Sequence, residues 1–214
     1  MKKAIFIFLF VLLVLMNVTV KKPIKKITIV STKKIKPDVV EIHNEDIKGH
    51  IKIPNTKIDY DLVKTTDNEY YLNHNVKKEV DPLGAIFIDY RNNLTDKKIL
   101  IYGHNSKTKE APLKELEKYL DYNTFKNNNL IYLSLDNNKY IYKIFSVILI
   151  DKNNYTYTKL NYTSDEYINH LSWLKNNSIH KSDIKLEQDS NIIILQTCNY
   201  YPKESFLLIS AKRS

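Results

Sequence analysis

Short apolar segments separated by turn residues are the feature of this sequence that most constrains its fold. Asp81-Pro82 and Asn92-Asn93 are examples of the separating turns. Many short strands with few helices predict a mainly β fold, a barrel with helical insertions. The predicted strands span residues 50–53, 58–63, 85–90, 98–102, 130–135, 140–150, 191–197 and 206–211.

Helical patterns interrupt these strands in three places, at residues 68–74, 112–125 and 164–176. The third window opens with Ser164 and carries Leu171 and Leu174 on one face, which predicts an amphipathic helix. A further short helix is expected at residues 39–47, with Asp38 as its N-cap.

An apolar run at residues 4–20 predicts a membrane anchor. Lys2 and Lys3 precede the run, and further lysines close it. Its length reaches the short end of the membrane-spanning range, and no small-residue cleavage site follows it, which favours an uncleaved anchor helix over a signal peptide. We therefore expect an anchor at residues 1–20, a basic linker at 21–37 and one folded domain at 38–214.

The orientation of this anchor depends on two rules that conflict. More lysines follow the apolar run than precede it, and the positive-inside rule then keeps the domain in the cytoplasm. An N-terminal anchor with a very short leading tail commonly exports the domain on its C-terminal side. The chemistry indicated by Cys198 and His104 favours export, so we expect a single-pass membrane protein with an extracellular domain, whose anchor contacts membrane lipid.

The net charge of +9 does not indicate a nucleic-acid partner. Residues 1–37 contain nine lysines and no acidic residue, which leaves residues 38–214 without net charge. The chain has only two arginines, Arg91 and Arg213, although arginine is the side chain that best reads phosphates and bases. A basic arm beside a membrane segment explains the charge better.

Cys198 is the only cysteine, and it follows the apolar strand predicted at 191–197. A thiol at a strand end can be held rigidly while it stays open to a groove, and its thiolate is a strong nucleophile. A lone cysteine is also frequently a buried structural residue, and this segment alone does not separate the two interpretations.

His104 occupies a similar position, after an apolar strand and Gly103. The strand fixes its backbone, and the glycine permits a sharp turn. A turn histidine bonded to local backbone is the plain alternative. A cysteine and a histidine at two strand ends can meet in space, which is the arrangement that a Cys–His acyl-transfer enzyme needs.

Five motifs then appear in one order along the chain: IKIPNTKIDY at 51–60, DNEYYL at 67–72, FIDYRNN at 87–93, YGHN at 102–105 and LQTCNY at 195–200. Together they resemble a class B sortase over residues 47–212. The resemblance implies an eight-stranded sortase β-barrel anchored outside a Gram-positive membrane. It also implies Cys198 as nucleophile and His104 as acid/base in transpeptidation.

In that reaction the thiolate attacks the threonine carbonyl of a C-terminal sorting signal, and a peptidoglycan-precursor amine releases the product. The resemblance implies that the partners are surface proteins carrying such a signal, and that Asn68, Leu72, Gln196 and Tyr200 bind the substrate. No cofactor is expected. No His, Cys, Asp and Glu cluster has the spacing of a metal site, so no metal is expected either.

The chain departs from the family where a strand after the cysteine carries an arginine that steadies the substrate carbonyl. Phe206 stands at that position. In a hairpin of 191–198 with 206–212, Cys198 lies near Phe206, Arg213 about 23 Å further along, and Arg91 about 20 Å from His104.

We therefore expect the arginine's role to be missing, or to be filled by a backbone N–H, Tyr200 or Lys203. Slow turnover follows from that expectation. One alternative is an inactive sortase-fold protein that binds sorting signals or wall peptides. Another is an anchored structural module in which the cysteine is buried and unreactive.

Overall fold

The computed structural model describes residues 44–214. The predicted anchor at 1–20 and linker at 21–37 therefore lie outside the described residues, as does most of the helix expected at 39–47. Of that helix, residues 44–46 form a loop and turn and Ile47 already begins a strand, so its predicted end is wrong. Within residues 44–214, no helix is long and apolar enough to cross a membrane.

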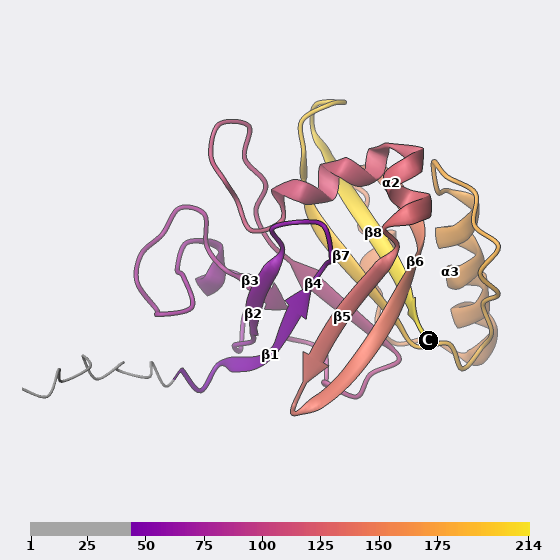
Figure 1. Cartoon of the computed structure of the whole chain (residues 1–214). Coiled ribbons are helices and arrows are strands. Elements are labelled where there is room, and N and C mark those ends of the chain that lie inside the picture. The colour runs from indigo at the N-terminus through magenta and orange to yellow at the C-terminus, as the bar shows by residue number, and fades with distance from the viewer. Residues whose placement is uncertain (1–43) are drawn as a thin grey trace, which may run out of the picture. The chain divides into compact units, whose positions relative to one another are not determined.

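Eight strands close into a barrel in the order β1-β2-β3-β4-β7-β8-β6-β5 (Figure 1), which confirms the predicted mainly β barrel. The pattern of short apolar segments is thus the pattern of the barrel wall. The strands are β1 (Ile47–Lys52), β2 (Asp59–Val63), β3 (Ile86–Ile88), β4 (Lys98–Tyr102), β5 (Leu130–Leu135), β6 (Asn138–Asp151), β7 (Ile192–Asn199) and β8 (Ser205–Arg213).

The helices are few and mostly short. They are the 3₁₀ helices η1 (Tyr70–Leu72), η2 (Lys114–Leu120) and η3 (Thr156–Thr158) and the α-helices α2 (Tyr122–Asn127) and α3 (Ser164–Asn176). The window predicted at 68–74 yields only the three residues of η1, because so short a segment closes a 3₁₀ turn more readily than an α-helix. Helix α3 has the predicted bounds, and Thr163 caps it in a capping box with Glu166.

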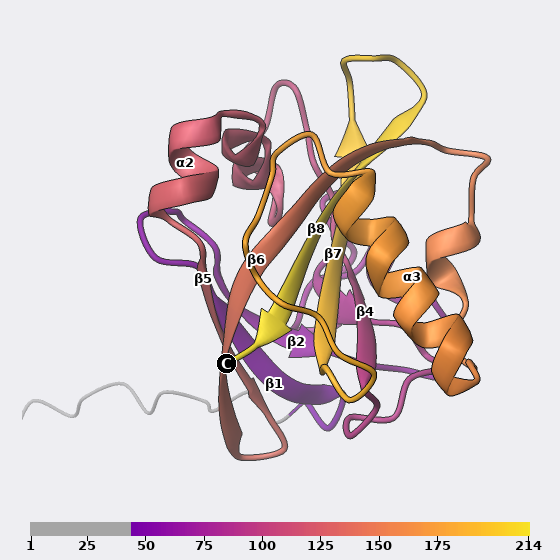
Figure 2. The same cartoon turned by 90° about the vertical axis from the view of Figure 1, so that its right-hand side faces the viewer.

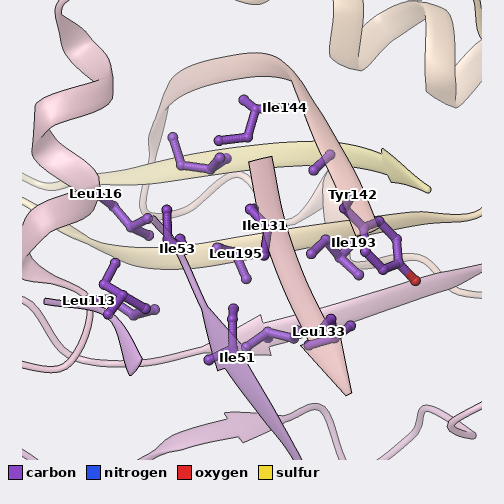
Figure 3. Close-up of a cluster of buried hydrophobic side chains, with 14 of the residues drawn as sticks. Ile51, Ile53, Leu113, Leu116, Ile131, Leu133, Tyr142, Ile144, Ile193 and Leu195 are labelled. Carbon is purple, nitrogen blue, oxygen red and sulfur yellow. The ribbon is translucent and has the colours of Figure 1, made fainter. Parts of the chain in front are cut away.

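Two apolar clusters lie on the two faces of the barrel wall. Alternating side chains such as Ile51, Ile131 and Leu195 fill the interior (Figure 3), and Leu113 and Leu116 pack against them. The opposite faces of β4, β6, β7 and β8 form a second cluster with α3, which lies against the outside of the barrel (Figures 1 and 2).

Two strand pairings bring distant parts of the sequence to one edge of the barrel. Strands β4 and β7 run parallel, with Tyr102 opposite Gln196. Strands β7 and β8 run antiparallel, with Cys198 directly opposite Phe206. The end of β4, the end of β7 and the start of β8 therefore meet, and the candidate residues His104, Cys198 and Phe206 lie at that meeting point.

Candidate active site

The ends of β4 and β7 are joined by hydrogen bonds beyond the regular ladder. The Gly103 amide donates to the Gln196 carbonyl at 3.2 Å, and Thr197 Oγ1 donates to the Gly103 carbonyl at 2.7 Å. A Cβ at Gly103 would lie 2.8 Å from Leu113 Cγ. The glycine is therefore required by close packing, since its φ is not in the left-handed region that a sharp glycine turn uses.

Asn105 ties the histidine segment to the cysteine strand. Its Nδ2 donates to the Cys198 carbonyl at 3.0 Å and to Glu117 Oε1 at 2.6 Å, and its side chain is buried. The Asn105 carbonyl in turn accepts a hydrogen bond from the Tyr200 hydroxyl at 3.0 Å. The sequence contained the signal for this residue, an asparagine directly after the histidine, but nothing in the sequence shows which strand it contacts.

His104 is oriented by a main-chain carbonyl. Its Nε2 lies 2.7 Å from the Leu72 oxygen, and because a carbonyl only accepts, Nε2 carries the proton. The other ring nitrogen, Nδ1, remains available for acid/base chemistry. The η1 segment that supplies this carbonyl is fixed by Tyr71, whose hydroxyl donates to Asp46 and accepts from Asn44, each at 2.9 Å.

One cavity of about 400 Å³ contains most of the predicted site. Cys198 and His104 both line it, although no hydrogen bond joins the thiol to the imidazole within the described residues. Three of the four predicted substrate-binding residues, Asn68, Leu72 and Gln196, line the same cavity. The cavity walls include residues that the sequence did not indicate: Arg91, Tyr102, Tyr155, Tyr157 and Thr158.

Tyr200 is the predicted binding residue that does not line this cavity. Its hydroxyl holds the Asn105 carbonyl, and Lys107 Nζ lies 5.0 Å from its ring centroid. Tyr200 therefore braces the loop after β7 from outside the cavity.

Phe206 occupies the position that the sequence register predicts, directly across the ladder from Cys198. Its side chain lines the cavity. No guanidinium is therefore attached to β8 beside the thiol, and the cavity presents an aromatic ring at that point.

Arg91 lies closer to the site than its position along the strand predicts. The sequence places it at the far end from His104, whereas the structure includes it in the cavity lining. Its Nε and Nη2 donate to the buried Asp89 carboxylate at 2.9 and 2.7 Å, and Nη2 also donates to the Thr158 carbonyl at 3.2 Å. Tyr102 completes the group with a 2.8 Å hydrogen bond to Asp89.

Asp89 is charged in this arrangement. Burial alone would raise the pKa of its carboxyl, but the hydrogen bonds from Arg91 and Tyr102 outweigh burial and hold the pKa below its usual value. The ion pair fixes Arg91 against the cavity wall, so its guanidinium forms one end of the cavity.

A buried lysine supports the other wall. Lys98 Nζ donates to the carbonyls of Tyr157 and Lys159 at 2.5 and 2.8 Å and lies 2.9 Å from His170 Nε2. The Tyr157 hydroxyl then donates to Gln196 Oε1 at 2.5 Å. A lysine in an apolar strand looks like a solvated edge residue, so sequence reasoning missed this support.

His170 gives the folded state a specific dependence on pH. Burial, and then the nearby Lys98 charge, lower the pKa of His170 to about 3, so it stays neutral when folded but protonates near pH 6.5 when unfolded. Its contribution to stability is complete above pH 6.5 and is lost as the pH falls from 6.5 toward 3. At pH 5 the loss amounts to about 2 kcal/mol.

Urea unfolding at pH 7.5 and pH 5 measures this loss, and in a His170→Gln variant it should shrink by about that amount. His50 provides the matched control. Hydrogen bonds from its ring to Asp61 and Asp59 outweigh its burial and raise its pKa. His50→Gln should therefore steepen the acid loss. An equal loss of stability in wild type and His170→Gln would contradict the assignment.

A closed barrel with a thiol and an imidazole in one cavity, at the ends of adjacent parallel strands, defines the sortase class of proteins. The sequence model of the sortase domain matches residues 51–214, and the chain belongs to the sortase family. Its similarity to proteins named sortase B places it in class B of that family.

Among its relatives, sortase B of Listeria monocytogenes is 35% identical over 73% of this chain and 64% of its own length. The crystal structure of Clostridium perfringens sortase B is 31% identical and superposes with a TM-score of 0.76, covering 80% of this chain and 95% of that one. A Staphylococcus aureus sortase B–substrate complex is 26% identical with a TM-score of 0.74, covering 80% and 81%. The match spans less than two thirds of the length of the curated relatives.

Proposed function

We propose that this chain is a cysteine transpeptidase that cleaves a C-terminal sorting signal after threonine and joins the new carboxyl end to a cell-wall amine. The observation that carries the proposal is that Cys198 and His104 line one cavity, with the His104 imidazole held by the Leu72 carbonyl. That hold leaves Nδ1 as the acid/base atom. The family's known chemistry, thiol-dependent transpeptidation, needs this pair.

The reaction proceeds in two halves. In the first, the Cys198 thiolate bonds to the threonine carbonyl carbon, and the tetrahedral oxyanion collapses as the C–N bond breaks. His104 in its imidazolium form gives its Nδ1 proton to the departing amine, which leaves a thioester. In the second half, the acceptor amine attacks the thioester, loses a proton to Nδ1, and releases the thiolate as an amide forms.

Three polar or apolar groups in the cavity wall are free to bind the peptide. Asn68 Oδ1 accepts from the Tyr90 amide at 2.9 Å, which leaves the Asn68 NH₂ group to donate to a substrate carbonyl. Gln196 Oε1 is similarly occupied by Tyr157, so the Gln196 amide presents its own NH₂ group. Leu72 offers apolar contact. Tyr200 acts through the loop that it braces.

The donor and acceptor follow from the family. Staphylococcus aureus sortase B has been solved as a substrate complex and in complex with triglycine, and both kinds of ligand support a sorting-signal donor and an amine acceptor here. We propose that residues 1–20 anchor the chain in the membrane lipid, that 21–37 form the linker, and that 38–214 act outside the cell. Surface proteins with a sorting signal and a peptidoglycan-precursor amine are then its partners.

The proposal is tested by incubating the full chain, in uncharged detergent, with a panel of fluorogenic sorting-signal peptides. We expect cleavage after threonine of one signal, and a new amide with triglycine when that amine is added, both identified by mass spectrometry. Peptides that bind without any cleavage, together with a Cys198 that resists thiol reagents, would instead establish the binding-protein alternative.

A further inference from the structure

A second, larger cavity adjoins the reaction cavity and is lined by positive charge. Its volume is about 810 Å³, and it shares Arg91 with the cavity that contains Cys198. Lys97, Lys98 and Lys159 also line it, whereas Asp96 supplies its only carboxylate. The proposed reaction uses none of these three lysines.

The charges in this second cavity are incompletely balanced. Arg91 pairs with Asp89, and Lys159 pairs with Glu166 at 2.7 Å. Lys97 Nζ contacts only the Gln188 carbonyl at 3.4 Å, and Lys98 Nζ contacts carbonyls, a hydroxyl and an imidazole. Within residues 44–214, neither lysine has a carboxylate partner.

Asp96 does not fill that gap. Its Oδ2 already accepts hydrogen bonds from Asn92 Nδ2 at 2.9 Å and from the Asn93 amide at 2.8 Å. Burial, and then the Arg91 charge, lower the pKa of Lys98 to about 7, which is the response of a lysine that has positive neighbours and no anion. An anion entering this cavity would oppose both causes.

The position of the cavity indicates which part of a substrate could reach it. The acyl half of the sorting signal must stay bound through both halves of the reaction, so it occupies the cavity that runs from Cys198 to Arg91. Along β7, Cys198 is six residues from Ile192, which pairs with Lys98, and that span measures about 20 Å. An extended peptide covers it with about six residues.

We propose that the second cavity binds acidic side chains lying about six residues before the scissile bond of the substrate. The inference rests on the proposed function and adds a substrate feature, a carboxylate-bearing segment upstream of the sorting motif. The strength of the contact comes from charges at a partly solvated surface, so it is modest and sensitive to salt.

The test measures binding to the full-length Cys198→Ala variant, so that turnover is not needed. Each panel peptide carries an uncharged fluorophore and, about six residues before its threonine, Glu-Glu, Gln-Gln or Lys-Lys. Fluorescence anisotropy at low salt should give a Kd for the Glu-Glu peptide about 3- to 20-fold below that for Gln-Gln, with the difference shrinking at 0.5 M salt.

A Lys97→Glu substitution in the same background should reverse the order and favour the Lys-Lys peptide. Lys139→Glu is the matched control, because Lys139 is exposed on the β5–β6 hairpin and lines neither cavity. It should keep the Glu-Glu preference.

Equal Kd values for the three peptides, or a reversal by Lys139→Glu as well, would overturn the inference. Wild-type cleavage that ignores upstream charge would overturn it too, while leaving the transpeptidase proposal intact. Charge-dependent binding without any cleavage by wild type would refute the transpeptidase proposal instead. If acidic groups on the acceptor amine, and not on the peptide, changed the reaction, the cavity would serve the acceptor and the inference would fail.

Discussion

A Cys198→Ala chain should lose sorting-signal cleavage entirely, and His104→Ala should lower kcat/KM by about 1000-fold or more. Alanine at 198 removes the atom that forms the thioester. Alanine at 104 removes the only imidazole in the cavity, and with it the proton that the leaving amine needs. Because the two groups act as a unit, the double variant should be no slower than Cys198→Ala alone.

Initial rates with the best panel peptide, measured at saturating and at low concentrations, separate kcat from KM. His180→Ala provides a matched control, because His180 Nε2 bonds the Tyr119 carbonyl and its ring packs on Phe125 away from the cavity. That variant should retain activity. A folded His104→Ala chain with near wild-type kcat/KM would remove His104 from the mechanism.

A Phe206→Arg chain should turn over about 100- to 1000-fold faster than wild type, since one oxyanion donor typically contributes that much. Position 206 lies directly across the ladder from Cys198, and its side chain lines the cavity. Arg91, the cavity's own arginine, is held by Asp89. A guanidinium from position 206 would therefore supply a donor to the carbonyl oxygen as its charge develops.

The gain should appear in kcat, with little change in KM, because the donor acts on charge that exists only in the transition state. Phe206→Met is the matched control: it also removes the ring but adds no donor, so it should give no comparable gain. Thermal unfolding of both variants establishes that they fold. A folded Phe206→Arg chain with unchanged or lower kcat would mean that another group already stabilises the oxyanion.

The strands could be predicted because their signals are local. Alternation and turn residues give β4 and β5 with the observed bounds. The same alternation predicts that Cys198 faces Phe206, since a hairpin register follows from which residues face the core. The order of strands around the barrel came from family resemblance, because nothing local specifies that β4 pairs with β7.

The side-chain environment of the site could be predicted less well, because long side chains decide it. Strand rise locates the backbone of Arg91, but its guanidinium position depends on Asp89 and Tyr102. Lys98 looks like an edge residue until the loop at 155–162 covers it. The 3₁₀ helices were overestimated as α-helix, since helical spacing over one or two turns does not separate the two forms.

The parallel pairing of β4 with β7 also determines when the protein becomes reactive. Gly103 and Thr197, whose hydrogen bond joins the two strand ends, are separated by 94 residues, and everything between them must be synthesised first. Such non-local contacts form late because the chain entropy of closing a long loop must be overcome before the contact is made. A nascent or C-terminally truncated chain therefore carries the histidine but no assembled nucleophile, and the chemistry begins only when the molecule is complete.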